Sequence, residues 1–406
     1  MEISELHSLL LILVIAGAAP FLCEWIPRIR LPLVVLEIVL GILIGPQVLK
    51  LASAGPTIQV FATFGLAFLF FLVGFEIDYP AIRGRPLAIG VLGWLASLII
   101  CLSVGFGLQA AGIVESGLIV GAAMSTTALG TLLPILRDAN ELQTKFGAYV
   151  MASGAMGEFG PILLVVLALS SGEGEHSGSI LLMLAFTLII VVGAFIAFKY
   201  RPPRIILMLQ KKMHTSAQLP VRLSILVLAS LVILARDFGL DAVLGALAAG
   251  VVVALASPGA HGESLRHKLE AISFGFFAPI FFIGTGLRYD LNALISNKMA
   301  LLQLPMFLVL FLVIRGLPAL MARRDLDLRS RIALGFLSST QLPLVIAIIG
   351  MKSGAVSTVT AASLSGAGMV SLLLFPVVAL NLRRAKEQIP SETSLEVSLP
   401  LKMELP

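Results

Sequence analysis

The stretch AYVMASGAMGEFGPILLVVL, residues 148–167, is long enough to cross a membrane and carries a single charged residue, Glu158. A carboxylate at the centre of a membrane-spanning helix costs about 2.5–3.5 kcal/mol on insertion scales, so such groups usually serve a function. We therefore expect Glu158 to bind a proton, a metal cation, or each in turn. The alternative is a lipid-facing carboxyl group, or one that makes only a structural hydrogen bond.

The composition outside this stretch is that of a membrane protein. Of the 406 residues, 58% are hydrophobic and 13% are charged, and the mean hydropathy is +1.03. A soluble domain has about a quarter of its residues charged. Apolar runs of membrane-spanning length predict an all-α polytopic protein with about thirteen transmembrane helices. These helices are expected near residues 6–23, 32–49, 57–76, 87–109, 116–136, 146–170, 178–198, 220–235, 239–256, 270–287, 299–321, 331–351 and 355–382.

The positions of the basic residues predict an orientation, because cytoplasmic loops collect Lys and Arg. With the N-terminus outside, 22 of the 28 basic residues lie in inside loops or in the tail, five lie in outside loops, and Arg315 lies within a span. We therefore expect the C-terminus in the cytoplasm, and we read the basic runs as topology determinants rather than as a nucleic-acid surface. Residues 1–382 form the expected transmembrane domain, and 383–406 the expected disordered tail.

Two predicted spans are interrupted at their centres by polar residues. The fifth reads GAAMSTTALGTLLP over residues 121–134, with Ser125, Thr126 and Thr127 at mid-membrane. The twelfth reads LGFLSSTQLPLV over 334–345, with Ser339, Thr340 and Gln341 just before a proline. Such paired interruptions indicate the binding site of a transporter built from inverted repeats. We expect five-helix repeats near 32–170 and 239–382 with crossed broken helices. Alternatively, the hydroxyls bond back to their own helices and the prolines only kink them.

Other charges inside the predicted spans are few. Arg315, in LFLVIRGLPAL over 310–320, remains charged in proteins and needs a counter-charge, for which Glu158 is the leading candidate. Glu37 is the most embedded of the remaining acids, and either a structural or dimer-interface hydrogen bond or a functional role fits it. Soluble catalytic patterns are missing from the sequence: it has no phosphate loop, Cys/His metal spacing or nucleophile elbow. We expect neither an enzyme nor a bound cofactor.

Several motifs, in order and spacing, resemble the second family of monovalent cation:proton antiporters, which includes Kef-type and bacterial sodium/proton exchangers. They are RLPLVVLEIVLGILIGP (30–46), FLVGFEID (71–78), MSTTAL (124–129), GLDAVLGALAAG (239–250) and PIFFIGTGL (279–287). The resemblance covers about residues 8–382. It implies exchange of Na⁺ or K⁺ for H⁺ by alternating access in a bacterial inner membrane. It also implies a homodimer in which the early helices of each half form a scaffold and the broken-helix bundle moves against it.

The resemblance also implies roles for individual residues. Glu158 falls where the family carries its ion-binding Asp, Arg315 where relatives place a Lys or Arg that pairs with the acid, and Thr126 and Thr127 at the broken helix. Together with Ser125 and Ser153, these are the candidate ion- and proton-binding residues. Two departures are Glu158 in place of Asp, and Gly157 where the family has Asp, Asn or Gln. A single carboxylate resembles the electroneutral branch of the family.

Two other functions remain open from the sequence. A sodium-coupled symporter on a related ten-helix scaffold would usually show two sodium sites rich in Asn, Gln and Glu, whereas this chain has one strong acid at the midplane. A membrane sensor that does not transport would be favoured by loss of the acid or the arginine, and this chain keeps both.

Overall fold

The computed structural model describes residues 2–25, 32–76, 84–169, 215, 217–238, 242–257, 259–289, 291–341 and 356–387, and these are helical, without strands in those ranges. The helices are α1 (Glu2–Trp25), α2 (Leu33–Ile44), α3 (Pro56–Glu76), α5 (Arg85–Ala110), α6 (Gly117–Met124), α7 (Leu129–Asp138), α8 (Lys145–Leu169), α11 (Leu219–Asp237), α12 (Ala242–Ala256), α13 (Ala260–Ile272), η1 (Ser273–Phe277), α14 (Ala278–Leu287), α15 (Leu291–Ile295), α16 (Lys298–Phe311), η2 (Leu312–Gly316), η3 (Leu317–Ala322), α17 (Leu328–Ser338) and α19 (Thr358–Glu387).

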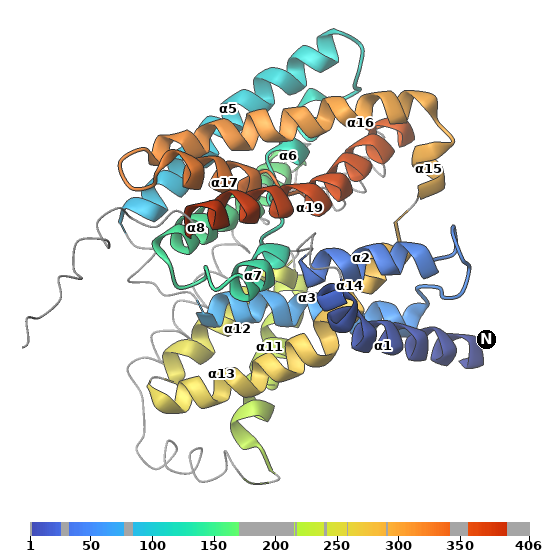
Figure 1. The fold of residues 1–406 in the computed structure, drawn as a ribbon, viewed down its shortest axis with the longest axis vertical. Helices are drawn as coiled ribbons and strands as arrows, with labels where there is room; N and C mark the ends of the chain where they lie inside the picture. The colour runs from blue at the N-terminus through green and yellow to red at the C-terminus, as the bar shows by residue number, and fades with distance from the viewer. Residues whose placement is uncertain are drawn as a thin grey trace, which may run out of the picture.

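These helices form two groups (Figure 1). The first, which we call the scaffold group, consists of α1, α2, α3, α11, α12, α13 and α14, where α3 packs on α12 and α2 on α14. The second, the crossing group, consists of α5, α6, α7, α8, α16, α17 and α19 with η2 and η3, where α5 packs on α6 and α8. Helix α7 lies between the groups and also contacts α2 and α3.

Glycines bring the scaffold helices into backbone contact. A Cβ at Gly41 of α2 would overlap the carbonyl of Ile283 in α14, and one at Gly250 of α12 would overlap the carbonyl of Phe71 in α3. Small residues that let helix backbones approach closely are typical of membrane interfaces, where packing rather than the hydrophobic effect holds helices together. This packing gives the scaffold group a rigid surface against which α7 lies.

Helix lengths and composition confirm a multi-pass membrane protein. Eight helical segments of the described chain are long and apolar enough to span a membrane, and two shorter apolar helices, Leu33–Ile44 and Ala242–Ala256, accompany them. The expected span at 178–198 lies outside the described residues. The span expected at 32–49 is shorter as a helix, because α2 ends before Gly45 and Pro46. Within the span expected at 331–351, α17 stops at Ser338, and residues 342–351 lie outside the described residues.

The last helix, α19, extends beyond the span expected at 355–382 and continues to Glu387. The cause is an anchor that sequence spacing does not show. The guanidinium of Arg383 donates to the carboxylate of Glu141 at 2.7 Å and lies 4.5 Å over the ring of Phe146. Residues 388–406, the rest of the expected tail, lie outside the described residues.

Candidate functional site

The fifth predicted span is two helices separated by a break. Helix α6 ends at Met124, and α7 begins at Leu129. Within the break the Thr127 amide donates to the Gly157 carbonyl of α8 at 2.9 Å, and the Ala128 amide donates to the Thr340 carbonyl at 2.8 Å. Backbone groups that a continuous helix would satisfy internally are thus satisfied by two other elements, as irregular backbone at membrane depth requires.

The second interruption meets the first. Gln341, which is fully buried, donates from Nε2 to the Met124 carbonyl at the C-terminal end of α6 at 2.7 Å. Its own amide receives support from α19, since it donates to the Ser371 hydroxyl at 3.0 Å. Gln341 therefore caps the first half-helix from the second interruption. The two polar centres singled out in the sequence lie in direct contact.

Glu158 lies at the N-terminal end of the second half-helix, α7. Its Oε2 accepts a hydrogen bond from the Leu129 amide, the first residue of α7, at 2.9 Å. Unpaired amides and the helix dipole make such an end a favourable place for negative charge. The half-buried carboxyl group of Glu158 therefore has one hydrogen bond that stabilises its ionised form.

Arg315 lies next to this crossing with a side chain only 3% exposed. It occupies a π-helical turn, Leu312–Gly316, that precedes a 3₁₀ stretch with Pro318 near its start. Its Nη2 donates to the Thr127 hydroxyl at 2.8 Å and to the Ser153 carbonyl at 2.9 Å, and its Nη1 donates to the Ser97 hydroxyl at 3.3 Å. π-helical turns often occur at functional sites, and here the turn carries the one cation of this cluster within the described residues.

The expected ion pair between Arg315 and Glu158 is not among the contacts of Arg315 in the described part of the chain. The guanidinium is instead held by hydroxyl and carbonyl oxygens. Thr127 is the central one, because its hydroxyl also donates to the Ser338 carbonyl at 2.6 Å. A hydroxyl has one proton and two lone pairs, and Arg315 Nε also lies 3.1 Å from this oxygen. In this conformation the Thr127 hydroxyl has no lone pair left for a cation.

Gly157, the departure from the family pattern next to Glu158, has a structural reason. A Cβ built at this position would overlap both the Thr127 hydroxyl and the Arg315 Nη2. The space that a side chain would fill is therefore occupied by the arginine and the threonine. The missing side chain at 157 and the buried cation at 315 belong to one arrangement.

The remaining candidates have more local roles. The hydroxyls of Ser125 and Ser339 donate to carbonyls of their own helices, at 2.9 and 2.7 Å, as the structural alternative anticipated. Thr126 donates to the Ala123 carbonyl at 2.9 Å and lies 3.4 Å from Gln341 Oε1. The Thr340 hydroxyl bonds back to the Phe336 carbonyl at 3.2 Å.

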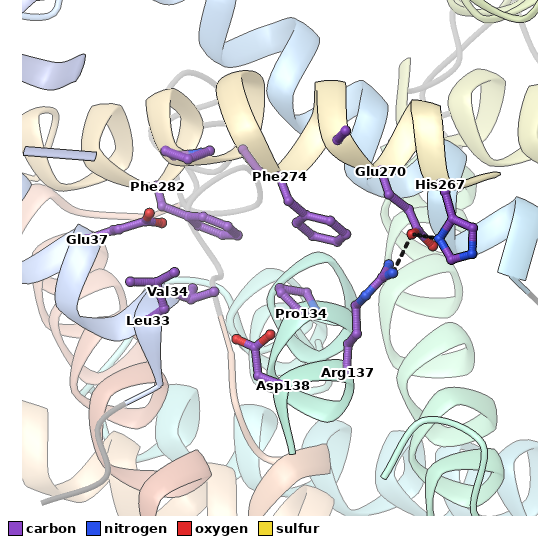
Figure 2. Close-up of a pocket in the computed structure, with 13 residues that line it drawn as sticks. Leu33, Val34, Glu37, Pro134, Arg137, Asp138, His267, Glu270, Phe274 and Phe282 are labelled. Carbon is purple, nitrogen blue, oxygen red and sulfur yellow. Dashed lines mark hydrogen bonds and ion pairs between the residues drawn. The ribbon is translucent and has the colours of Figure 1, made fainter. Parts of the chain in front are cut away.

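A cavity of about 350 Å³ lies where α7 meets the scaffold group (Figure 2). Its wall includes Arg137, one of the 22 basic residues counted above in predicted inside loops or the tail. Arg137 contacts Glu76 of α3 at 3.0 Å and Glu270 of α13 at 2.5 Å. The signal available in the sequence was two acids, Glu76 and Glu270, at the ends of apolar runs, but nothing indicated that one arginine joins them.

A second ionic cluster lies at the membrane edge of the crossing group. Asp325 contacts Arg85 at the start of α5 at 2.9 Å and Lys145 at the start of α8 at 3.3 Å. Burial acts to raise the pKa of Asp325, but the neighbouring Tyr149 hydroxyl, Lys145 and Arg85 outweigh it and lower that pKa below its usual value. The cluster ties together the helices that carry Glu158 and Arg315.

Residues 11–380 match the family described as sodium/hydrogen exchanger, transmembrane. The chain belongs to the sodium/hydrogen exchanger family. This match spans both interruptions, Glu158 and Arg315, so the whole site of this exchanger lies inside the family region.

Relatives of the exchanger extend over most of its length. YjbQ of Bacillus subtilis (strain 168), provisionally named a Na⁺/H⁺ antiporter, is 28% identical over 99% of this chain and 68% of its own. The Na⁺/H⁺ antiporter of Enterococcus hirae is 22% identical over 86% of this chain and 91% of its own. The solved structure of the sodium proton antiporter MjNhaP1 from Methanocaldococcus jannaschii superimposes with a TM-score of 0.64 over 93% of this chain, at 14% identity. That likeness supports the fold.

Proposed function

We propose that this exchanger is a secondary-active antiporter that exchanges a monovalent cation, Na⁺ or K⁺, for H⁺ at the carboxylate of Glu158. The observation that carries the proposal is the hydrogen bond from the Leu129 amide to Glu158 at the point where two broken helices meet. A titratable group at a half-helix end, in an otherwise apolar span, suits an ion that must bind and leave. The names of relatives, Na⁺/H⁺ antiporters, agree with this chemistry.

Exchange follows from competition for a single group. A proton and a cation neutralise the same carboxylate, so the binding of one displaces the other. If the carrier crosses the membrane barrier only with one of them bound, each direction moves one positive charge. The cycle is then electroneutral. Arg315 contributes by fixing Thr127 against Ser338, which keeps the crossing of the two breaks in place, and by adding a positive field beside the carboxylate.

Alternating access would consist of movement of the crossing group against the scaffold group. Helix α7 carries the amide that binds Glu158 and also contacts α2 and α3, so its displacement changes both the site and the contact between the groups. We propose that residues 1–382 form this transport domain from inverted repeats near 32–170 and 239–382. The proposed assembly is a homodimer in a bacterial inner membrane, with the N-terminus outside and the C-terminus in the cytoplasm.

Reconstitution into proteoliposomes tests the function. When Na⁺ or K⁺ is added outside, wild-type protein should alkalinise the lumen, because each cation that enters exports one H⁺, and no transport current should accompany the exchange. Glu158→Gln should abolish this exchange, because an amide releases no proton, while its melting temperature stays near that of wild type since the amide oxygen still accepts from Leu129. Glu263→Gln, which changes an exposed acid on α13, is the matched control.

Robust exchange by Glu158→Gln would refute the assignment. A current that scales with turnover would contradict electroneutral one-for-one exchange, and the absence of cation-driven flux in wild type would favour a sensor that does not transport.

A further inference from the structure

The cavity beside α7 has a buried acid in its wall that the exchange mechanism does not use. Glu37 of α2 is 3% exposed and points into the cavity (Figure 2). Within the described residues, its carboxylate has no hydrogen-bond donor and no cationic partner. An ionised carboxylate in such a place carries a high desolvation cost unless a counter-charge accompanies it.

The charges around the cavity leave this acid uncompensated. Arg137 is engaged by Glu76 and Glu270, and Arg266 lies 3.5 Å from Glu270. Two arginines therefore balance two carboxylates. His267, also in the wall, contacts Glu270 at 3.2 Å. Among the acids that line the cavity in the described part of the chain, this leaves Asp138, at the end of α7, and Figure 2 shows its carboxylate directed toward the cavity from α7, while Glu37 lies on α2.

We infer that Glu37 and Asp138 form a second cation site, which holds a hydrated alkali cation between the scaffold group and the crossing group. The cavity volume of about 350 Å³ corresponds to roughly ten waters at about 30 Å³ each, enough for a cation that keeps part of its water shell. One carboxylate comes from α2 and the other from α7. The occupant is therefore shared by the two groups that are proposed to move.

The position of this site suits a place where a transported cation binds before it reaches Glu158. Helix α7 has ten residues and spans about 15 Å, with the amide that binds Glu158 at one end and Asp138 at the other. Arg137, which lies in the cavity wall near the end of α7, is among the basic residues that the charge distribution assigns to the cytoplasmic side. The role as an entry site for that face rests on the proposed exchange function. Binding of the cation does not rest on it, and the two can be tested apart.

The direct test measures cation binding where Glu158 cannot contribute. Purified full-length Glu158→Gln is heated in NaCl, KCl or choline chloride at equal ionic strength, and the melting temperature is recorded. Na⁺ or K⁺ should still stabilise this variant relative to choline. The stabilisation should disappear when Glu37→Gln or Asp138→Asn is added, and it should persist when Glu263→Gln is added. Asp138 is exposed, so its variant keeps the test valid if Glu37→Gln fails to fold.

Two results would overturn the site. One is the absence of cation-dependent stabilisation in Glu158→Gln, and the other is a stabilisation that survives both cavity substitutions. Neither affects the assignment of Glu158, which depends on flux. In transport, Glu37→Gln should raise the apparent KM about tenfold for cation offered from the cavity side, since focused negative charge enriches cations by at least that factor. The KM from the opposite side should change less, and equal increases on both sides would contradict an entry role.

Discussion

Arg315 donates from Nη2 to the hydroxyl of Thr127 at 2.8 Å, and that hydroxyl donates in turn to the Ser338 carbonyl at 2.6 Å. This chain of two hydrogen bonds joins the eleventh predicted span, the first broken helix and the second broken helix. Arg315 therefore connects the two interruptions through the hydroxyl of Thr127.

Arg315→Ala should lower the free energy of unfolding by about 3 kcal/mol, because the Ser153 carbonyl and the Thr127 hydroxyl lose a buried charged donor. Arg315→Lys keeps the charge without the fork of donors and should recover part of this loss. Thermal melting in detergent measures both, with the exposed Arg323→Ala as control. If Arg315→Ala melted like Arg323→Ala, the guanidinium would not hold the crossing together.

Gly157→Ala should impair both stability and exchange, although it adds only a methyl group. The new Cβ would overlap Thr127 and the guanidinium of Arg315, so one of the two must move. Gly17→Ala in α1 is the matched control, because a Cβ there meets nothing within 4 Å. Melting temperature and the pH profile of exchange should change for residue 157 and remain the same for residue 17. Equal behaviour of the two variants would contradict the tight fit.

Arg137→Gln should destabilise the contact between the two groups by about 2 kcal/mol, since it leaves Glu76 and Glu270 buried close to each other without their shared cation. Adding Glu270→Gln should restore part of the stability, because one of the two negative charges is then gone. A double-mutant cycle on melting temperature gives the coupling. Additive losses from Arg137→Gln and Glu270→Gln would show that the ion pairs contribute nothing together.

The lowered pKa of Asp325 predicts how the stability of the protein depends on pH. Its pKa is lowered in the folded protein, so its contribution is present above the unfolded value of about 3.9 and is lost as pH falls through the folded pKa. Asp325→Asn should therefore melt below wild type near pH 7. The gap should close as pH falls below about 4. A gap that stayed constant with pH would mean that the side chain acts by shape and not by charge.

The two interruptions at the centre of the site could be predicted from the sequence, whereas the partner of Arg315 could not. Ser, Thr, Gly and Pro inside apolar runs disrupt helices whatever surrounds them, so the interruptions at Thr127 and Thr340 could be placed from local chemistry. The helix bounds agree with this placement, since α6 ends at Met124, α7 begins at Leu129 and α17 ends at Ser338. The partner of Arg315 could not be deduced in this way. Charge alone favours Glu158, whereas the direction of the side chain depends on a π-helical turn and on the space left by Gly157.

Contacts between distant segments account for the other differences. Arg137 and Arg383 resemble ordinary loop or tail cations in the sequence, yet each meets carboxylates far along the chain. Glu37 could be ranked as the most embedded remaining acid from its neighbours, but only the arrangement of α2 against α7 reveals the cavity it faces. Apolar periodicity places a helix in a membrane. It does not say which other helix the rare charge on it will meet.

The overlap that a side chain at position 157 would cause has an evolutionary consequence. The residue before the carboxylate and the residue at 315 cannot vary independently, because both compete for the same volume beside Thr127. Lineages that place an amide or acid at 157 must shorten the cation at 315 or send it along another path. Substitutions at these two sites should therefore occur together along the family tree. A pair of positions 158 residues apart in the sequence would then be inherited as one trait.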